Sequence, residues 1–177
     1  GCGKGGFISK ISVKNPDINY IAIDLVDAML GLAKRKVEEE YNQNNKEINN
    51  IYLTRYDIER IANIFGRDDK IERIYINFCN PWPRGKHHKK RLTHTRQLEK
   101  YKQFLKENGE IYFKTDDDNL FNDSISYFKS SGFEIIKNTY DLQDEPEFWD
   151  NIKTEHEDMF TEQGIKIKAL IARVITN

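Results

Sequence analysis

The sequence has little of what marks a membrane-spanning, disulfide-linked or metal-binding protein. It contains no apolar run long enough to cross a bilayer. Its two cysteines, Cys2 and Cys79, form neither a disulfide framework nor a metal-ligand pattern, and such usage is typical of the reducing cytosol. The four histidines are not spaced as metal ligands either, so we expect no metal.

An excess of charge of one sign is also lacking. The 28 Lys and Arg residues balance 29 Asp and Glu residues, which leaves a net charge of −1 and no overall field that would attract nucleic acid. Any nucleic-acid site must therefore be a local cluster of charge. The length of 177 residues and the 38% hydrophobic content suit one domain with one core.

The chain has no initiating Met and opens directly on the glycine-rich segment 1–6. A glycine loop of this kind normally follows a buried strand, and no strand precedes it here. We therefore expect residues 1–177 to be a single domain that is incomplete at its N-terminus.

Short apolar runs alternate with helical patterns along the chain, which is typical of an α/β domain with a mostly parallel sheet. Strands are predicted at residues 20–25, 51–54, 71–78, 110–114, 133–139 and 165–176. No helix is evident between the last two runs, so we expect those strands to pair antiparallel. The connection 141–163 between them is long and acidic, and loops of that length are often functional.

The glycine segment is a candidate ligand loop. Gly1, Gly3 and Gly5 let the backbone turn and approach a ligand closely. Asp24 ends the next predicted strand, where a carboxylate can accept hydrogen bonds from the ribose of a nucleotide-like cofactor. Asp57 follows the strand after that and can either contact an adenine or cap the helix that begins at Ile58. Gly1, Gly3 and Gly6 also fit a dinucleotide fingerprint, so NAD and a plain tight turn stay open as alternatives.

A second candidate site follows the strand 71–78, because ligands in such sheets bind beyond the carboxyl ends of strands. Asn80 is placed there, followed by Pro81-Trp82-Pro83 and then five Lys and Arg residues within positions 84–91. A cationic cluster of this density is a phosphate-binding footprint, and the prolines that stiffen its entry favour a built site over a solvated surface. Trp82 can stack on a base or pack in the core.

These residues resemble a known family, the bacterial tRNA (guanine-N7)-methyltransferases. The resemblance covers nearly the whole chain, and its most specific part is the run from Asn77 to Pro83 with the basic segment and Arg91-Leu92-Thr93 behind it. The glycine loop with Phe7, the Lys114-Thr115-Asp116 segment and the segment 154–157 match in the same order.

The resemblance implies a Rossmann-like class I methyltransferase fold, S-adenosylmethionine as the cofactor, and N7 of a guanosine in the variable loop of tRNA as the methyl acceptor. From the composition we expect a cytoplasmic protein, and the sequence leaves open whether it is a monomer or a homodimer. The cofactor residues that the resemblance implies are Gly1, Gly3, Gly5, Asp24, Asp57 and Asn80, with Asn80 also at the catalytic position. The substrate residues are Arg84, Asp116, Thr154, Glu155, His156 and Glu157, and we expect the tRNA backbone at Lys86, Lys89, Lys90 and Arg91.

One position departs from the family pattern, which usually has Asp where this chain has Asn80. An amide cannot act as a carboxylate base. However, N7 of guanine is a bare acceptor with no proton to remove, so the reaction mainly requires alignment of the reacting atoms. We therefore expect Asn80 to orient a donor on the base or the cofactor.

Three other functions compete with this interpretation. An amino-methyltransferase that acts on adenine N6 would carry an Asn-Pro-Pro-aromatic motif, which the run from Asn80 to Pro83 nearly matches. An NAD-dependent oxidoreductase would use the glycine loop and Asp24. A non-catalytic RNA-binding module would explain the basic segment but not Asp24 and Asp57.

Overall fold

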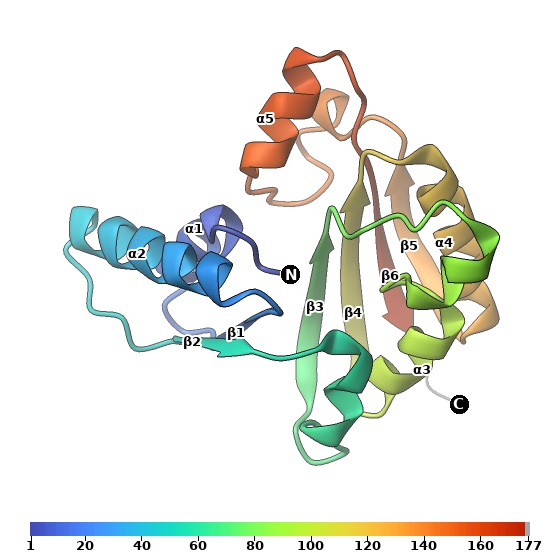
Figure 1. The fold of residues 1–177 in the computed structure, drawn as a ribbon, viewed down its shortest axis with the longest axis horizontal. Helices are drawn as coiled ribbons and strands as arrows, with labels where there is room; N and C mark the ends of the chain where they lie inside the picture. The colour runs from blue at the N-terminus through green and yellow to red at the C-terminus, as the bar shows by residue number, and fades with distance from the viewer. Residues whose placement is uncertain (176–177) are drawn as a thin grey trace. The chain divides into compact units, whose positions relative to one another are not determined.

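The structure, a computed structural model, describes residues 1–175 of the chain. By its internal contacts the chain divides into two compact units. Unit 1 contains residues 1–58 and 152–158, and unit 2 contains residues 59–151 and the chain from Met159 onwards. Figure 1 labels the helices and strands of both units.

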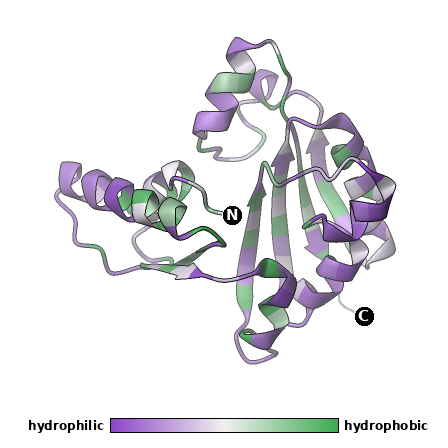
Figure 2. Cartoon of the chain, in the orientation of Figure 1, coloured by the Kyte–Doolittle hydropathy of each residue, from purple (hydrophilic) through white to green (hydrophobic). Residues whose placement is uncertain are grey.

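Unit 1 is a small α/β layer. Its elements are α1 (Gly6–Lys14), β1 (Tyr20–Asp24), α2 (Asp27–Gln43) and β2 (Ile51–Arg55). The two strands pair in parallel, in a register from Tyr20 opposite Ile51 to Asp24 opposite Arg55. Helix α2 buries Ala33, Val37 and Tyr41, which are spaced by four residues and so share one helix face. Its remaining surface is largely hydrophilic (Figure 2).

A buried asparagine joins the elements of unit 1. The side-chain amide of Asn50 donates to the backbone carbonyls of Ser12, Asn15 and Ile18 at 3.1, 3.2 and 2.9 Å. Its oxygen accepts from the Tyr41 hydroxyl of α2. These bonds tie the end of α1 and the chain that follows it to the start of β2 and to α2.

Unit 2 is built on a four-stranded sheet of order β3-β4-β6-β5. Its elements are η1 (Ile58–Asn63), β3 (Ile71–Asn77), η2 (Gly85–Lys90), α3 (Thr95–Lys102), β4 (Leu105–Thr115), α4 (Asp118–Ser130), β5 (Phe133–Thr139), η3 (Leu142–Asp144) and β6 (Lys168–Val174). Strand β3 pairs with β4 in parallel, and β6 pairs antiparallel with both β4 and β5. Helix α4 packs against β5, β4 and β6.

Aromatic rings form the core between α4 and this sheet. Phe113 of β4 lies 6.3 Å from Phe121 and 6.5 Å from Phe128, both on α4, and Phe133 of β5 lies 5.5 Å from Phe128. All four side chains are buried. Their burial fixes α4 against the carboxyl half of β4, and so fixes the loop 116–117 that joins the two elements.

The mostly parallel arrangement with an antiparallel pairing of the last two strands is confirmed. Two expectations about the elements are wrong. Strand β4 begins at Leu105, five residues before the predicted start at 110, and a register shift between Ile71 and Arg73 accommodates the turn around Asn108. The connection 141–163 contains a helix, α5 (Glu155–Glu162). The predicted end of the last strand at Thr176 lies outside the described residues.

Candidate active site

The glycine turn of unit 1 is hydrogen-bonded to Asp24. Backbone N–H groups of Gly3 and Val26 donate to the two carboxylate oxygens of Asp24 at 2.9 and 3.0 Å, and Cys2 donates to the carbonyl of Ile23 at 2.9 Å. Each carboxylate oxygen carries a further lone pair. The structure thus brings the predicted glycine loop and the predicted carboxylate together.

Each of the three predicted glycines has its own reason to be glycine. A Cβ at Gly1 would lie 3.0 Å from Asp24 Oδ2 and would crowd that oxygen. Gly3 has a φ of +57° with nothing within 4 Å of an added Cβ, so it borders open space. Gly5 is buried, and a Cβ there would lie 2.6 Å from the Cα of Ala33 on α2. Helix packing therefore accounts for the glycine at position 5, and a contact of its backbone with the cofactor stays a prediction.

Asp24 and Asp57 follow neighbouring parallel strands. Asp24 is the last residue of β1 and lies opposite Arg55, the last residue of β2. The ladder continues one step further, because the N–H of Tyr56 donates to the carbonyl of Asp24 at 3.1 Å. Asp57 comes next and is half-buried, directly before η1. Both carboxylates therefore lie at the carboxyl edge of the same strand pair, where ligands bind in open sheets.

Asn80 lies on unit 2, in an unusual turn after β3. Phe78 and Trp82 have φ values of +54° and +42°, a left-handed conformation that large side chains rarely adopt. The N–H of Trp82 donates to Asn80 Oδ1 at 3.0 Å, and the N–H of Phe78 donates to the carbonyl of Lys114 at 2.9 Å. Asn80 is exposed, and its amide nitrogen makes no hydrogen bond within residues 1–175. Left-handed residues of this size tend to mark functional sites.

Cys79, next to Asn80, is not a candidate nucleophile. Burial of the thiol raises its pKa to about 12. The thiolate, which is the nucleophilic form, is therefore scarce at neutral pH.

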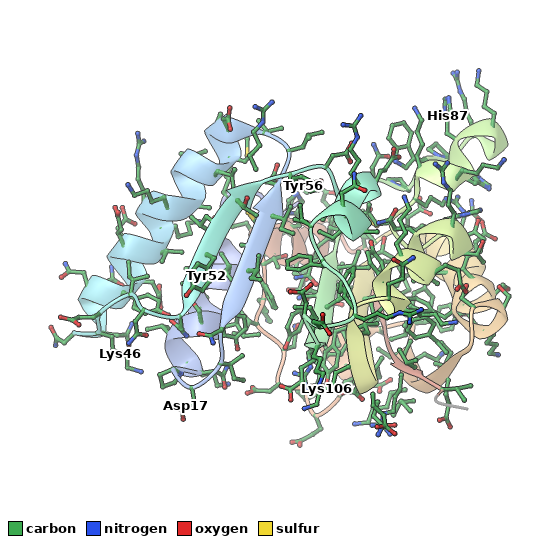
Figure 3. All side chains as sticks on the ribbon, turned by 90° about the horizontal axis from the view of Figure 1, so that it is seen from below. Asp17, Lys46, Tyr52, Tyr56, His87 and Lys106 are labelled. Carbon is green, nitrogen blue, oxygen red and sulfur yellow. The ribbon has the colours of Figure 1, made fainter. Side chains whose placement is uncertain are left out.

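The basic segment forms η2, an exposed and hydrophilic turn (Figure 2). The cationic side chains of Arg84, Lys86, Lys89 and Lys90 are exposed, as expected for a phosphate-binding surface. Long side chains around His87 project away from the ribbon in Figure 3. Trp82 is half-buried and lies outside the core, with Lys90 Nζ 4.9 Å from its ring centre.

Arg91 corrects a further expectation. Its side chain is 1% exposed, so its guanidinium cannot reach a tRNA phosphate as we expected. Instead Nε donates to the carbonyl of Pro81 at 2.7 Å, and one terminal nitrogen donates to Asp123 at 2.6 Å and to the Tyr127 hydroxyl at 3.2 Å. Nothing in a single sequence separates this buried cation from its exposed neighbours.

The three consecutive aspartates between β4 and the first turn of α4 have different roles. Asp117 caps α4 by accepting from the N–H of Leu120 at 2.7 Å, and Asp118 pairs with Lys168 at 2.7 Å. Asp116 is half-buried, and its carboxylate makes no hydrogen bond or ion pair in the part of the chain that the structure describes. Lys168 also donates to the backbone carbonyl of Asp116 at 2.9 Å, a contact across 52 positions that the sequence does not reveal.

The segment 154–157 starts helix α5. Thr154 and Glu157 form a reciprocal capping box: each donates its backbone N–H to the other's side chain, at 2.6 and 3.3 Å. Both are buried, at 8% and 4% exposure. Glu155 pairs with Lys36 of α2, and this hydrogen bond lowers the pKa of Glu155. His156 is exposed. The Thr-x-x-Glu spacing is a helix-start signal that could have revealed α5.

Comparison with known proteins decides the family. A family model described as "Putative methyltransferase" matches residues 1–170. A tRNA (guanine-N(7)-)-methyltransferase of Clostridium botulinum is 61% identical over 172 residues, which span 97% of this chain and 78% of the relative. The chain belongs to the tRNA (guanine-N7)-methyltransferase family. Equally named relatives of Clostridium beijerinckii and Acetivibrio thermocellus are 57% and 53% identical over the same shares of both chains.

Solved structures support the fold of this methyltransferase chain. A crystal structure of an S-adenosylmethionine-dependent methyltransferase from Mesorhizobium loti superposes with a TM-score of 0.60 at 13% identity, covering 98% of this chain and 88% of that one. The N-methyltransferase NodS of Bradyrhizobium japonicum gives 0.63 at 11% identity, covering 99% and 76%. In residues 1–175 no helix is long and apolar enough to cross a membrane.

Proposed function

We propose that this chain transfers the methyl group of S-adenosylmethionine to N7 of a guanosine in the variable loop of tRNA. The observation that carries the proposal is the arrangement in unit 2, where the turn at Asn80 runs directly into the exposed cations from Arg84 to Lys90. A residue at the predicted catalytic position is thus joined, within a few residues, to a surface suited to a phosphate backbone.

The residues of unit 1 fit the proposed cofactor. S-adenosylmethionine, when bound, supplies an electrophilic methyl group on a positively charged sulfur. Asp24 has free lone pairs on both carboxylate oxygens for ribose hydroxyls, and Gly1 leaves one of those oxygens uncrowded. Asp57, two residues beyond the adjacent strand β2, would accept from the adenine amino group. Gly3 borders open space in which the backbone can approach the ligand.

Asn80 then acts by alignment rather than by removing a proton. Guanine N7 has a lone pair and no hydrogen, so no base is needed. The Asn80 oxygen already accepts from Trp82, and its amide nitrogen is the donor that remains. Guanine O6, the acceptor beside N7, is a partner of the right chemistry for that donor. This role replaces the expectation that Asn80 orients a donor on the base or the cofactor, because its oxygen accepts from the N–H of Trp82.

Asp116 supplies a complementary contact to the base. Its carboxylate can accept from guanine N1–H and N2–H, which leaves N7 free for the methyl group. Lys168 holds the backbone of Asp116, so the side chain starts from a fixed position. We also propose substrate contacts for Arg84, Glu155 and His156, which are exposed, whereas the buried Thr154 and Glu157 act through the helix that they cap.

The phosphate backbone of tRNA would bind Lys86, Lys89 and Lys90. These residues lie on one short turn, and their charge is not cancelled by an acidic residue within 84–91. Contacts of this kind set the register of the substrate and carry little sequence information. Choice of the guanosine is therefore assigned to Asn80 and Asp116.

The direct test is methyl transfer from labelled S-adenosylmethionine to unmodified tRNA, with the product nucleoside identified by mass spectrometry. We expect 7-methylguanosine, and none when the guanosine of the variable loop is replaced by adenosine. N6-methyladenosine would favour the amino-methyltransferase alternative. Binding of tRNA without any transfer would favour an RNA-binding module, and calorimetric binding of NAD in place of S-adenosylmethionine would favour the oxidoreductase.

A further inference from the structure

Arg91 lies at the end of the basic segment, but its side chain points back to the start of that segment. Its Nε donates to the carbonyl oxygen of Pro81 at 2.7 Å. The same guanidinium donates to Asp123 at 2.6 Å and to the Tyr127 hydroxyl at 3.2 Å, both on α4. A cation with a 1% exposed side chain needs such partners, because an unpaired buried charge is very costly. Arg91 therefore bridges the Pro81 peptide and α4.

The residues next to Arg91 are fixed to the same support. Thr93 Oγ1 and Ser124 Oγ of α4 are 2.7 Å apart and buried. The ring centre of His94 lies 5.0 Å from that of Tyr127. The anchor for Arg91 is thus a rigid part of unit 2, since α4 is packed on the aromatic core.

The Pro81–Trp82 peptide is held from both sides. Its carbonyl oxygen accepts from Arg91, and its N–H donates to Asn80 Oδ1 at 3.0 Å. The plane of one peptide group is therefore set by the guanidinium, and that plane determines where the Asn80 amide can lie. Trp82 is at the same time kept in its left-handed conformation, with φ of +42°, which would relax without support.

We propose that Arg91 is a positioning residue for Asn80, acting through the Pro81–Trp82 peptide and anchored by Asp123 and Tyr127. The inference rests on the proposed function, because it assigns Arg91 to the alignment of the guanine base. Arginine is suited to this task, because its planar fork donates in two directions from one rigid group, whereas the ammonium of lysine is a point charge on a flexible stem.

The test is Arg91→Lys in the full chain, in a Trp149→Phe background that leaves Trp82 as the single tryptophan of the two in the sequence. We expect kcat on tRNA to fall about tenfold to a hundredfold, as for a small misplacement of a reacting group, with KM for tRNA and the Kd for S-adenosylmethionine unchanged. Acrylamide should quench Trp82 fluorescence more strongly, because the turn is no longer held.

The matched control is Arg173→Lys in the same background. Arg173 lies on β6 of the same unit and likewise pairs with a carboxylate, donating twice to Glu110 Oε2, at 2.9 and 3.3 Å. We expect it to change neither kcat nor quenching. Asp123→Asn and Tyr127→Phe leave Arg91 in place and weaken its anchor, so each should shift both readouts in the same direction by less. They also keep the proposal testable if Arg91→Lys does not fold.

A folded Arg91→Lys protein with native kcat and native quenching would overturn the inference. So would a raised KM with native kcat, because that result describes a residue that binds tRNA directly. Failure of the proposed function is distinguishable, since the wild-type chain itself would then make no 7-methylguanosine.

Discussion

Gly3 and Asp24 are joined by a hydrogen bond of 2.9 Å from the backbone N–H to Oδ2. The carboxylate that we assign to the cofactor ribose therefore also orders the glycine turn. Removing the whole side chain would disturb both, so the informative change is one that keeps the shape of the residue.

We expect Asp24→Asn to remain folded and to lose cofactor affinity. Each charged hydrogen bond that is lost should cost about 1.5–3 kcal/mol, measured by calorimetry with S-adenosylmethionine. Asp27→Asn is the control, because Asp27 is an exposed carboxylate only three positions away that pairs with Arg55 at 3.6 Å. Native affinity in folded Asp24→Asn would show that the ribose is held elsewhere.

Replacing Lys86, Lys89 and Lys90 together by Ala should weaken tRNA binding and flatten its salt dependence. Each lost phosphate contact lowers the slope of log K against log salt by about 1. The control replaces Lys34, Lys106 and Lys129, which are equally exposed and change the net charge by the same amount. Equal slopes for the two triple variants, measured by filter binding across a salt series, would mean that net charge and not the η2 surface attracts tRNA.

Asn80→Asp keeps the turn, because a carboxylate oxygen can still accept from the N–H of Trp82. It loses the amide donor that we assign to guanine O6, but its charge favours the cationic product, so we expect kcat to fall less than in Asn80→Ala. Asn80→Ala loses the turn and the amide together, and we expect kcat to fall about tenfold to a thousandfold, more than substrate affinity falls. Single-turnover assays would separate the two effects. Native turnover of Asn80→Ala would remove this residue from the mechanism.

Acid should destabilise the protein through His94. Its Nδ1 caps α3 by accepting from the N–H of Arg96 at 3.2 Å, which requires the neutral imidazole. Burial lowers the pKa of His94, and the nearby charges of Lys89 and Arg91 act in the same direction. Because the folded pKa lies below the unfolded value, the contribution is fully present above about pH 6.5 and is lost as the pH falls through the folded pKa.

His94→Asn is the comparison, because Asn is an equally good cap that does not titrate. Urea unfolding at pH 8 and pH 5 should show a larger loss of stability for the wild type than for His94→Asn. The same loss in both proteins would assign the acid sensitivity to other groups.

Much of the fold followed from local patterns. Strands 20–25, 51–54, 71–78 and 133–139 were predictable because each is a short apolar run between turn residues. The helix α5 was missed because few of its residues are buried and no apolar stripe marks it, although its capping box was present in the sequence.

The candidate site was predictable where one residue type in one place has a clear chemistry, as for Asp24 after the glycine turn. The structural roles of Arg91 and Gly5 could not be predicted from the sequence. Both depend on partners more than 25 positions away, Asp123 and Ala33, and burial alone separates a structural arginine from the exposed cations beside it. Long-range packing of that kind leaves no trace in local spacing.

The position of β6 has a consequence for the order in which the protein can fold. Strand β6 is the neighbour of β5 in the sheet, but 28 residues (140–167) separate the two strands in the chain. Their paired residues Thr139–Ala169 and Phe133–Val174 lie 30 and 41 positions apart.

Until β6 has been synthesised, β4 and β5 cannot be bridged, and each leaves an unpaired edge. During synthesis on the ribosome, β6, which pairs with β5, emerges after α4 and β5. We therefore expect unit 2 to close in a single late step, with β3, β4 and α4 waiting as an incomplete and aggregation-prone intermediate until residues 168–174 insert between the two waiting strands.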